Sequence, residues 1–308
     1  MNAGDETEAS IAWGSDPNHR PNHRHDALEP AQSFGATERQ ADVLQQITDL
    51  EAEAAELDAM LGSRPDADFE RTTAFKAWTI NDVLRHLHAG DSMAALSVTD
   101  TAAFQDFLAD VRAKRAKGLT PRDDARQRFG HLAGHALLAA WREKLAALCT
   151  LLAARDPDAR LKWSGPDMGL RMFTTARQME VWAHGQEIYD VLGLDRPASD
   201  RLRNIAQIGV RTFGWTFANR GLPPPGEAPH VRLDAPSGGH WEWNPPSESN
   251  VVAGSALEFA QVVTQVRNIA DTRLVVVGEP AKAWMAIAQC FAGPPEAPPA
   301  PGTRRRMG

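Results

Sequence analysis

The sequence has no long hydrophobic run, no signal peptide and no excess of positive charge. No stretch reaches the roughly 18 apolar residues of a membrane-spanning helix. The N-terminus, "MNAGDETEASIAWGSDPNHRPNHRHD", lacks the apolar stretch of a secretory signal. The net charge of -7 argues against a general nucleic-acid binder, because neutralising phosphates requires a basic surface. We therefore expect neither a membrane nor a nucleic acid among its partners.

Cysteine is scarce as well: Cys149 and Cys290 are the only two. Both lie in apolar, helix-forming surroundings, so two buried free thiols are expected and not a disulfide. This favours a cytoplasmic location. The chain has 308 residues, of which 43% are hydrophobic and 24% charged. That length and composition are typical of a globular protein with two ordinary domains.

Helical periodicity dominates the first two thirds of the chain. Residues 1–36 are polar and interrupted by proline, and predict a disordered tail. Amphipathic patterns then predict five helices, over residues 37–61, 79–98, 123–155, 173–192 and 199–219. Thr79 is the expected N-cap of the second, and Gly193 the expected end of the fourth. In the third, Gly130 and Gly134 either bend the helix or allow close packing.

The pattern changes after "LPPPGEAP" at residues 222–229, where we place a domain boundary. "HVRLDA" and "HWEWN" alternate with a period of two and are joined by "PSGG", which predicts a hairpin. "VVAGSALEFAQVVTQV" predicts a helix, "RLVVVG" a buried strand and "AKAWMAIAQCFAG" another helix. The expected fold class is therefore α+β: a helical bundle with a four-helix core over residues 37–220, a small α/β domain over 229–294, and a disordered tail over 295–308.

The predicted helix at 173–192 carries a stripe of polar residues. Glu180, His184 and Glu187 share one face, because a helix turns 100° per residue. A buried carboxylate or imidazole is costly unless it is paired or bound to a metal. Glu180 and His184, four residues apart, can reach one ion from adjacent turns. An ordinary ion pair at the same spacing is the alternative.

A third ligand would have to come from a neighbouring helix. The segment "DVLRHLHAGD" offers His86, His88 and Asp91. Asp91 falls near the centre of that helix's apolar arc, an unfavourable place for a carboxylate without a partner. His86 and His88 flank the arc on opposite sides, so periodicity does not choose between them. Imidazole and carboxylate ligands suit zinc, and also nickel, iron or manganese.

Two segments together resemble a known family. "WTINDVLRHL" at 78–87 and "MEVWAHG" at 179–185 are similar to the N-terminal domain of mycothiol-dependent maleylpyruvate isomerases, within the DinB-like superfamily of four-helix bundles. Residues 39–290 resemble an actinobacterial branch of metal-binding proteins. The resemblance implies a divalent metal, usually zinc, on His86, Glu180 and His184. It makes His88 a neighbour of that metal. We assign His88, together with Asp91 of the same predicted helix, to cofactor binding. Where the family commonly has aspartate, this chain has Glu187.

The resemblance also implies a chemistry. Three protein ligands leave a position open for a low-molecular-weight thiol such as mycothiol, whose pKa the metal lowers. The thiolate then adds to an electrophilic small molecule, leading to isomerisation or S-transfer. The family's arginine corresponds best to Arg267, which would hold a substrate carboxylate or an enolate. We expect Arg267 and Glu187 to be catalytic. For Arg267, a surface or inter-domain salt bridge is the alternative.

Two other functions stay open at the level of the sequence. One is a thiol-independent biosynthetic isomerase or cyclase that uses the cavity of the bundle. The other is a metal-binding or ligand-binding protein without turnover, because a fold does not determine a function. Turnover without thiol would indicate the first, and binding without turnover the second. A monomer or a homodimer is expected in each case.

Overall fold

The computed structural model describes residues 35–165 and 167–304. Most of the tail expected at residues 1–36 therefore lies outside the described residues. From Ala36 onward the described chain forms one compact unit. No helix in this part of the chain is long and apolar enough to cross a membrane. Cys149 and Cys290 are buried and free, as predicted.

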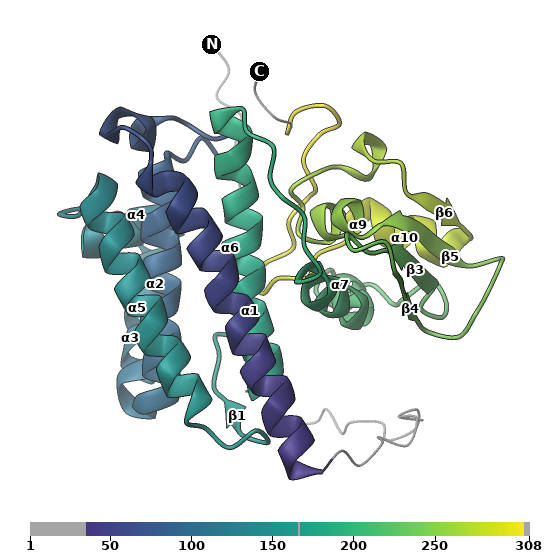
Figure 1. The fold of residues 1–308 in the computed structure, drawn as a ribbon, viewed down its shortest axis with the longest axis horizontal. Coiled ribbons are helices and arrows are strands. Elements are labelled where there is room, and N and C mark those ends of the chain that lie inside the picture. The colour runs from purple at the N-terminus through teal and green to yellow at the C-terminus, as the bar shows by residue number, and fades with distance from the viewer. Residues whose placement is uncertain (1–34, 166, 305–308) are drawn as a thin grey trace. The chain divides into compact units, whose positions relative to one another are not determined.

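Four long helices form the core of the first half and run side by side (Figure 1). They are α1 (Ala36–Gly62), α2 (Ile80–Thr99), α5 (Gly134–Ala153) and α6 (Leu170–Leu192). Their apolar faces meet in one hydrophobic cluster that includes Leu50, Leu87 and Trp141. Around them lie a 3-10 helix η1 (Asp66–Glu70), α3 (Thr101–Ala116), α4 (Pro121–Phe129) and the short antiparallel strands β1 (Arg160–Leu161) and β2 (Met168–Gly169).

The helices differ from the prediction in three places. Helix α3 was not predicted, and the helix expected at 123–155 is two helices, α4 and α5. The chain turns between them, and Gly134 takes a φ of +54°, a left-handed conformation that favours glycine. The helix expected at 199–219 is divided at Thr212 into α7 (Leu202–Arg211) and α8 (Phe213–Ala218). The fold class is α+β, as predicted.

The second half contains a four-stranded sheet in the order β4-β3-β5-β6. The hairpin of β3 (His230–Asp234) and β4 (His240–Trp243) was predicted. Strand β5 (Val251–Ser255) pairs in parallel with β3 and antiparallel to β6 (Val275–Val277). The remaining elements are α9 (Ala256–Val263), the 3-10 helix η2 (Ile269–Asp271) and α10 (Glu279–Ile287).

Two predictions about this sheet were wrong. "VVAGS" is a strand and not the start of a helix, since a short apolar run at the end of a loop fits either structure. The strand β6 is not buried: it pairs with β5 on one side only, and Val275 and Val277 are exposed. The apolar run "VVV" forms an edge strand. Successive side chains of a strand point to opposite faces of the sheet, so Val275 and Val277 face away from the core although they are apolar.

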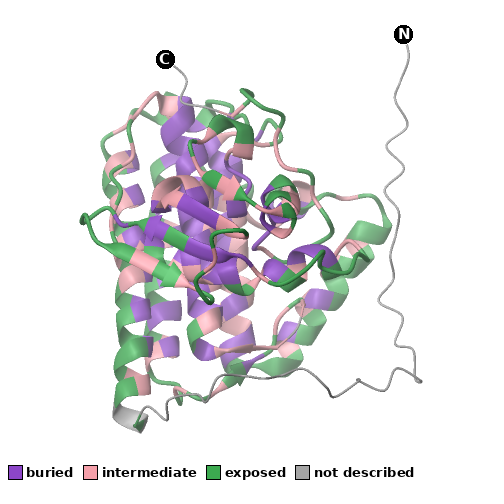
Figure 2. Cartoon of the chain, turned by 90° about the vertical axis from the view of Figure 1, so that its right-hand side faces the viewer, coloured by how far each residue is buried: buried purple, intermediate pink, exposed green. Residues whose placement is uncertain are grey.

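Helix α6 contributes to two hydrophobic clusters, and more than half of its residues are buried. Figure 2 shows the buried residues of the described chain in its interior and the exposed ones toward the outside. Val181 and Ile188 belong to the bundle cluster, while Met179 and Trp182 pack with α7, α8 and the sheet. By packing, α7 and α8 share a core with the sheet, although the predicted boundary at 222–229 placed them with the bundle. Packing from both sides holds the polar stripe of α6 in place.

The end of the described chain is bound to the rest of the molecule. The sequence predicted a disordered tail at 295–308, yet residues 295–304 make specific hydrogen bonds. Asn268 donates to the Pro299 carbonyl, and the Gly302 amide donates to Asp271. Lys76 forms an ion pair with Glu296. A proline-rich segment has no periodic pattern that reveals such long-range contacts, so the sequence did not indicate them.

Candidate metal site and its surroundings

Helix α2 is positioned by its first turn. The Thr79 side chain accepts a hydrogen bond from the Asp82 amide, and Asp82 accepts one from the Thr79 amide, which forms a capping box. Asp82 also accepts two charge-assisted hydrogen bonds from Arg126 of α4, at 2.7 and 2.6 Å. These contacts determine where α2 begins, and therefore the direction in which His86 points, one turn later.

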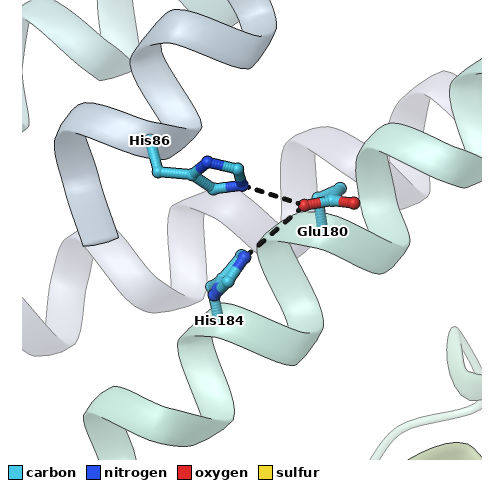
Figure 3. Close-up of side chains that lie close together, drawn as sticks. All are labelled: His86, Glu180 and His184. Atoms are coloured by element: carbon cyan, nitrogen blue, oxygen red, sulfur yellow. Dashed lines mark hydrogen bonds and ion pairs between the residues drawn. The ribbon is translucent and has the colours of Figure 1, made fainter. Parts of the chain in front are cut away.

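Helix α6 carries the other two members of the site. It ends at Gly193, whose φ of 71° closes the helix in a left-handed conformation. Glu180 and His184 lie one turn apart in the middle of α6, between the two hydrophobic clusters. His86 of α2 faces them across the interface of the two helices (Figure 3).

His86, Glu180 and His184 converge on one point. His86 Nε2 lies 3.2 Å from Glu180 Oε2, and His184 Nε2 lies 3.5 Å from the same oxygen. The ligand atoms of all three residues lie within 4.8 Å of one another. Two ligands that are each about 2.0–2.1 Å from a tetrahedral zinc ion would be about 3.3–3.4 Å apart. The donor atoms therefore suit one divalent ion in chemistry, and the two distances to Glu180 Oε2 are close to this spacing.

The protonation states suit metal ligation. Burial raises the pKa of Glu180, but hydrogen bonds with His184 and His86 outweigh it and hold the pKa well below its usual range. Burial lowers the pKa of His184, and the contact with Glu180 offsets this only in part. At neutral pH the carboxylate is ionised and the His184 imidazole is neutral, the forms that bind a metal.

Two aromatic rings from the loop before α2 pack against His184. The Trp78 ring is stacked at 6.1 Å from the His184 ring, and the Phe75 ring meets His184 edge-on at 5.1 Å. The turn between them contains Lys76 and Ala77, with φ of 49° and 51°. Two consecutive left-handed residues other than glycine are a local strain, which a surrounding structure must hold in place.

Glu187 lies one turn beyond His184, in a cluster of charged groups. Burial raises its pKa to about 7, although the nearby Arg304 charge lowers it. Glu187 Oε1 accepts a hydrogen bond from Arg304 Nη1 at 3.1 Å, and Oε2 is buried without a hydrogen-bond partner among the described residues. The Arg304 guanidinium also lies 5.1 Å from the Phe75 ring centroid. A carboxyl group whose pKa is raised to about 7 therefore lies one turn of α6 beyond the candidate ligand His184.

Arg267 reaches α6 next to this carboxyl group. Its two terminal nitrogens donate to the two oxygens of Asp190, at 2.6 and 2.7 Å. Both side chains are largely buried. This bidentate pair links the α/β half to α6, one turn beyond Glu187.

The two remaining predicted residues lie elsewhere on α2. The His88 ring packs edge-on against Phe129 at 4.4 Å, and its Nδ1 is buried with no partner in the described chain. Asp91 is fully buried and accepts hydrogen bonds from Trp141 Nε1 at 3.0 Å and Arg177 Nε at 2.9 Å. The structure thus brings His86 to Glu180, turns His88 toward α4, and gives Asp91 two partners.

Sequence reasoning missed four residues near this site: Phe75, Trp78, Arg177 and Arg304. For Arg177 a signal existed, because spacings of three and seven residues place it on the same stripe of α6 as Glu180 and His184. Trp78 begins the segment that carries the family resemblance, although no role was assigned to it. No such signal existed for Phe75 or Arg304, which reach the site from loops.

Comparison with known proteins identifies the family. The family profile described as "Mycothiol maleylpyruvate isomerase N-terminal domain" matches residues 50–189, which include all three candidate ligands. The chain belongs to the mycothiol-dependent maleylpyruvate isomerase-like family. Two proteins from two strains of Mycobacterium tuberculosis, both called uncharacterized, are 39% identical over 249 residues, covering 81% of this chain and 96% of theirs.

Solved structures of the family are more distant in sequence. A crystal structure of the mycothiol-dependent maleylpyruvate isomerase is 18% identical, covering 74% of this chain and 88% of that chain, with a TM-score of 0.45. A histidine-to-alanine mutant of that isomerase aligns with the same identity and coverage and a TM-score of 0.43.

Proposed function

We propose that this protein is a metal-dependent enzyme that activates a low-molecular-weight thiol, such as mycothiol, for isomerisation of an electrophilic small molecule or for S-transfer to it. The convergence of His86, Glu180 and His184 on one point is the observation that carries the proposal. Family membership supplies the thiol and the reaction class. Zinc is the metal that we expect, since the ligand set and the spacing suit it.

The cluster is partly accessible from outside, since the side chains of His86 and Glu180 are 29% and 24% exposed. A divalent ion held there would lower the pKa of a thiol and supply a thiolate nucleophile at neutral pH. Phe75 and Trp78 cover His184 and limit the access of water to the ligands.

Glu187 is proposed as the group that moves a proton. Its free Oε2 accepts the proton from the sulfur of the thiol, and the thiolate adds to an electrophilic carbon of a conjugated double bond. In S-transfer, Glu187 returns the proton to the adjacent carbon, and a thioether is released. In isomerisation, the bond rotates and the thiolate leaves again, with no net transfer of a proton. A pKa of about 7 suits both directions of proton movement.

Arg267 is proposed to act through Asp190 and not by direct contact with the electrophile. Asp190 occupies both terminal nitrogens of Arg267. The Arg267 charge lowers the pKa of Glu187, whereas the Asp190 charge raises it. The pair holds the turn of α6 that carries Glu187, so Arg267 is a positioning residue in this proposal.

The test is thiol-dependent turnover after metal reconstitution. The protein is stripped with a chelator, reloaded with zinc, and supplied with mycothiol and a panel of conjugated electrophiles. We expect consumption of the electrophile that requires both zinc and thiol, and that is lost in His184→Ala. Turnover without thiol would favour an isomerase or cyclase that uses no thiol, and thiol binding without any turnover would favour a binding protein.

A further inference from the structure

Strand β6 has an outer side on which its backbone pairs with no other strand of the described chain. It is the last strand in the sheet order β4-β3-β5-β6 and pairs only with β5 (Figure 1). The strand is the apolar run Val275–Val277. It contains no lysine, proline or inward-pointing charge, the features that commonly keep an edge strand from pairing with another chain. Such an edge can accept one more strand.

The two side chains on the outer face of β6 are apolar and open to solvent. Val275 is 57% exposed and Val277 is 38% exposed. Both point to the same face of the sheet, because side chains alternate along a strand, whereas Val276 packs against the core on the other face. Single apolar residues on a surface are common, but these two are neighbours on one unpaired strand. A strand that paired with β6 would cover them as well.

A charged residue of opposite sign lies at each end of the strand. Arg273 precedes Val275 by two residues, and its side chain is 93% exposed, with Glu258 contacting only its Nε, at 3.4 Å. Glu279 follows Val277 by two residues and lies exposed in the first turn of α10. Along the chain the edge is therefore basic, then apolar, then acidic. This order is complementary to its own reverse.

We propose that β6 is a homodimer interface, in which the β6 strands of two copies pair antiparallel about a twofold axis at Val276. In an antiparallel pair, residues equally far before and after the axis lie opposite each other. Val275 then lies opposite Val277 of the second copy, and Arg273 lies opposite Glu279 of the second copy. Each contact occurs twice, as a closed twofold dimer requires. The sheets of the two copies join into one continuous sheet.

The charges favour a second copy in this register. Opposite charges and apolar pairs directly across two strands stabilise the pairing, and like charges destabilise it. If the register were shifted by two residues in either direction, Arg273 or Glu279 would lie opposite a valine. The contact involves a short strand from each copy, so the buried area is below that of a permanent interface. We therefore expect a reversible dimer that forms with increasing concentration.

Sedimentation equilibrium of the full chain over a range of concentrations measures the oligomeric state. We expect the wild type to show a monomer–dimer equilibrium. Val275→Lys places a charge in the apolar pair, and the position is exposed in the monomer. It should weaken dimerisation by about tenfold, because the change occurs twice in the dimer, and leave the melting temperature of the monomer unchanged.

Charge reversal tests the register. Glu279→Arg sets two basic groups opposite each other, and Arg273→Glu sets two acidic groups opposite each other, so each change alone should weaken the dimer. The double variant Arg273→Glu/Glu279→Arg should restore it, because the ion pair forms again with its signs exchanged. Arg115→Glu is the matched control: it makes the same change of charge at an exposed position of α3 and should have no effect.

Disulfide cross-linking tests the register without depending on the affinity. A mixture of Val275→Cys and Val277→Cys should form a linked dimer on mild oxidation. Either variant alone should not, since two copies of the same position lie diagonally across the strands, beyond the reach of a disulfide bond. Cys149 and Cys290 are buried and do not compete.

Three outcomes would overturn the proposal. One is a wild type that remains monomeric up to about 1 mM, the weak end of measurable affinities. Another is a dimer that Val275→Lys leaves intact, which would place the interface elsewhere. The third is a monomer that dimerises only after deletion of residues 1–34, which would mean that this segment of the same chain occupies the edge.

Discussion

Arg304 Nη1 donates a 3.1 Å hydrogen bond to Glu187 Oε1, which ties the end of the described chain to the middle of the site. The same nitrogen donates to the Gln265 carbonyl at 2.8 Å, and the guanidinium lies over the Phe75 ring. The Arg304 side chain thus contacts α6, the α/β half and one of the two aromatic rings beside the candidate metal site.

Arg304→Ala should raise the pKa of Glu187 above its value of about 7, because the Arg304 charge lowers it in the wild type. The carboxyl band of Glu187 in infrared difference spectra, assigned with Glu187→Gln, reports this titration. Arg273→Ala is the control, since the Arg273 side chain is 93% exposed and contacts Glu258 instead. An unchanged titration in Arg304→Ala would mean that the contact is not formed in solution.

Glu187→Gln should remove a pH dependence of stability. The folded pKa of Glu187, about 7, is above the ordinary value of 4.5, so the folded state binds more protons between these values. The stability contributed by the protonated group is complete below pH 4.5 and is lost as the pH rises through 7. At about 1.4 kcal/mol per pKa unit, the free energy of unfolding of the wild type should fall relative to Glu187→Gln by up to about 3 kcal/mol.

Chemical denaturation of both proteins between pH 5 and 8 measures this difference, and comparing the two at each pH cancels the effect of metal loss from the histidines. A constant difference across this range would contradict the raised pKa.

Metal binding should distinguish the two histidines of α2. His86→Ala, Glu180→Ala and His184→Ala should each remove the bound ion, whereas His88→Ala should keep it, because His88 packs against Phe129. Elemental analysis should find about one divalent ion per wild-type chain. Deleting residues 1–34 beforehand excludes ions held by the histidines of that segment. Full occupancy in Glu180→Ala, or loss in a folded His88→Ala, would reject the assignment.

The Arg267–Asp190 pair should show energetic coupling. Single and double alanine variants form a cycle, and we expect a coupling energy of about 1–3 kcal/mol in stability, because each single variant leaves a buried charge without its partner. If Arg267 positions Glu187, Arg267→Ala should also slow turnover while zinc content stays constant, and Arg267→Lys should restore only part of the rate. Additive stabilities together with unchanged turnover would contradict this role.

The sequence predicted the features that depend on local spacing. The capping box at Thr79, the end of α6 at Gly193 and the hairpin around "PSGG" all follow from residues close together in the chain. The pairing of Glu180 with His184 is also local, since it needs only a helix. The choice of His86 over His88 required the family resemblance, because both flank the same apolar arc.

Long-range packing decided the rest. Whether "VVAGS" becomes a strand depends on β3 and β6, neither of which adjoins it in sequence. The bound C-terminal residues and Arg304 depend on partners as far away as Lys76. For α7 and α8, the shared core with the sheet is a property of the tertiary structure that helical periodicity does not contain.

The central claim, that the three ligands hold a metal which binds a thiol, is tested most directly with a cobalt-substituted sample. Adding mycothiol should produce an intense sulfur-to-cobalt charge-transfer band, and binding should weaken at low pH, because the thiol binds as a thiolate. The band should be absent in His184→Ala and retained in Arg267→Ala. A cobalt spectrum that does not respond to mycothiol or to other small thiols would contradict the claim.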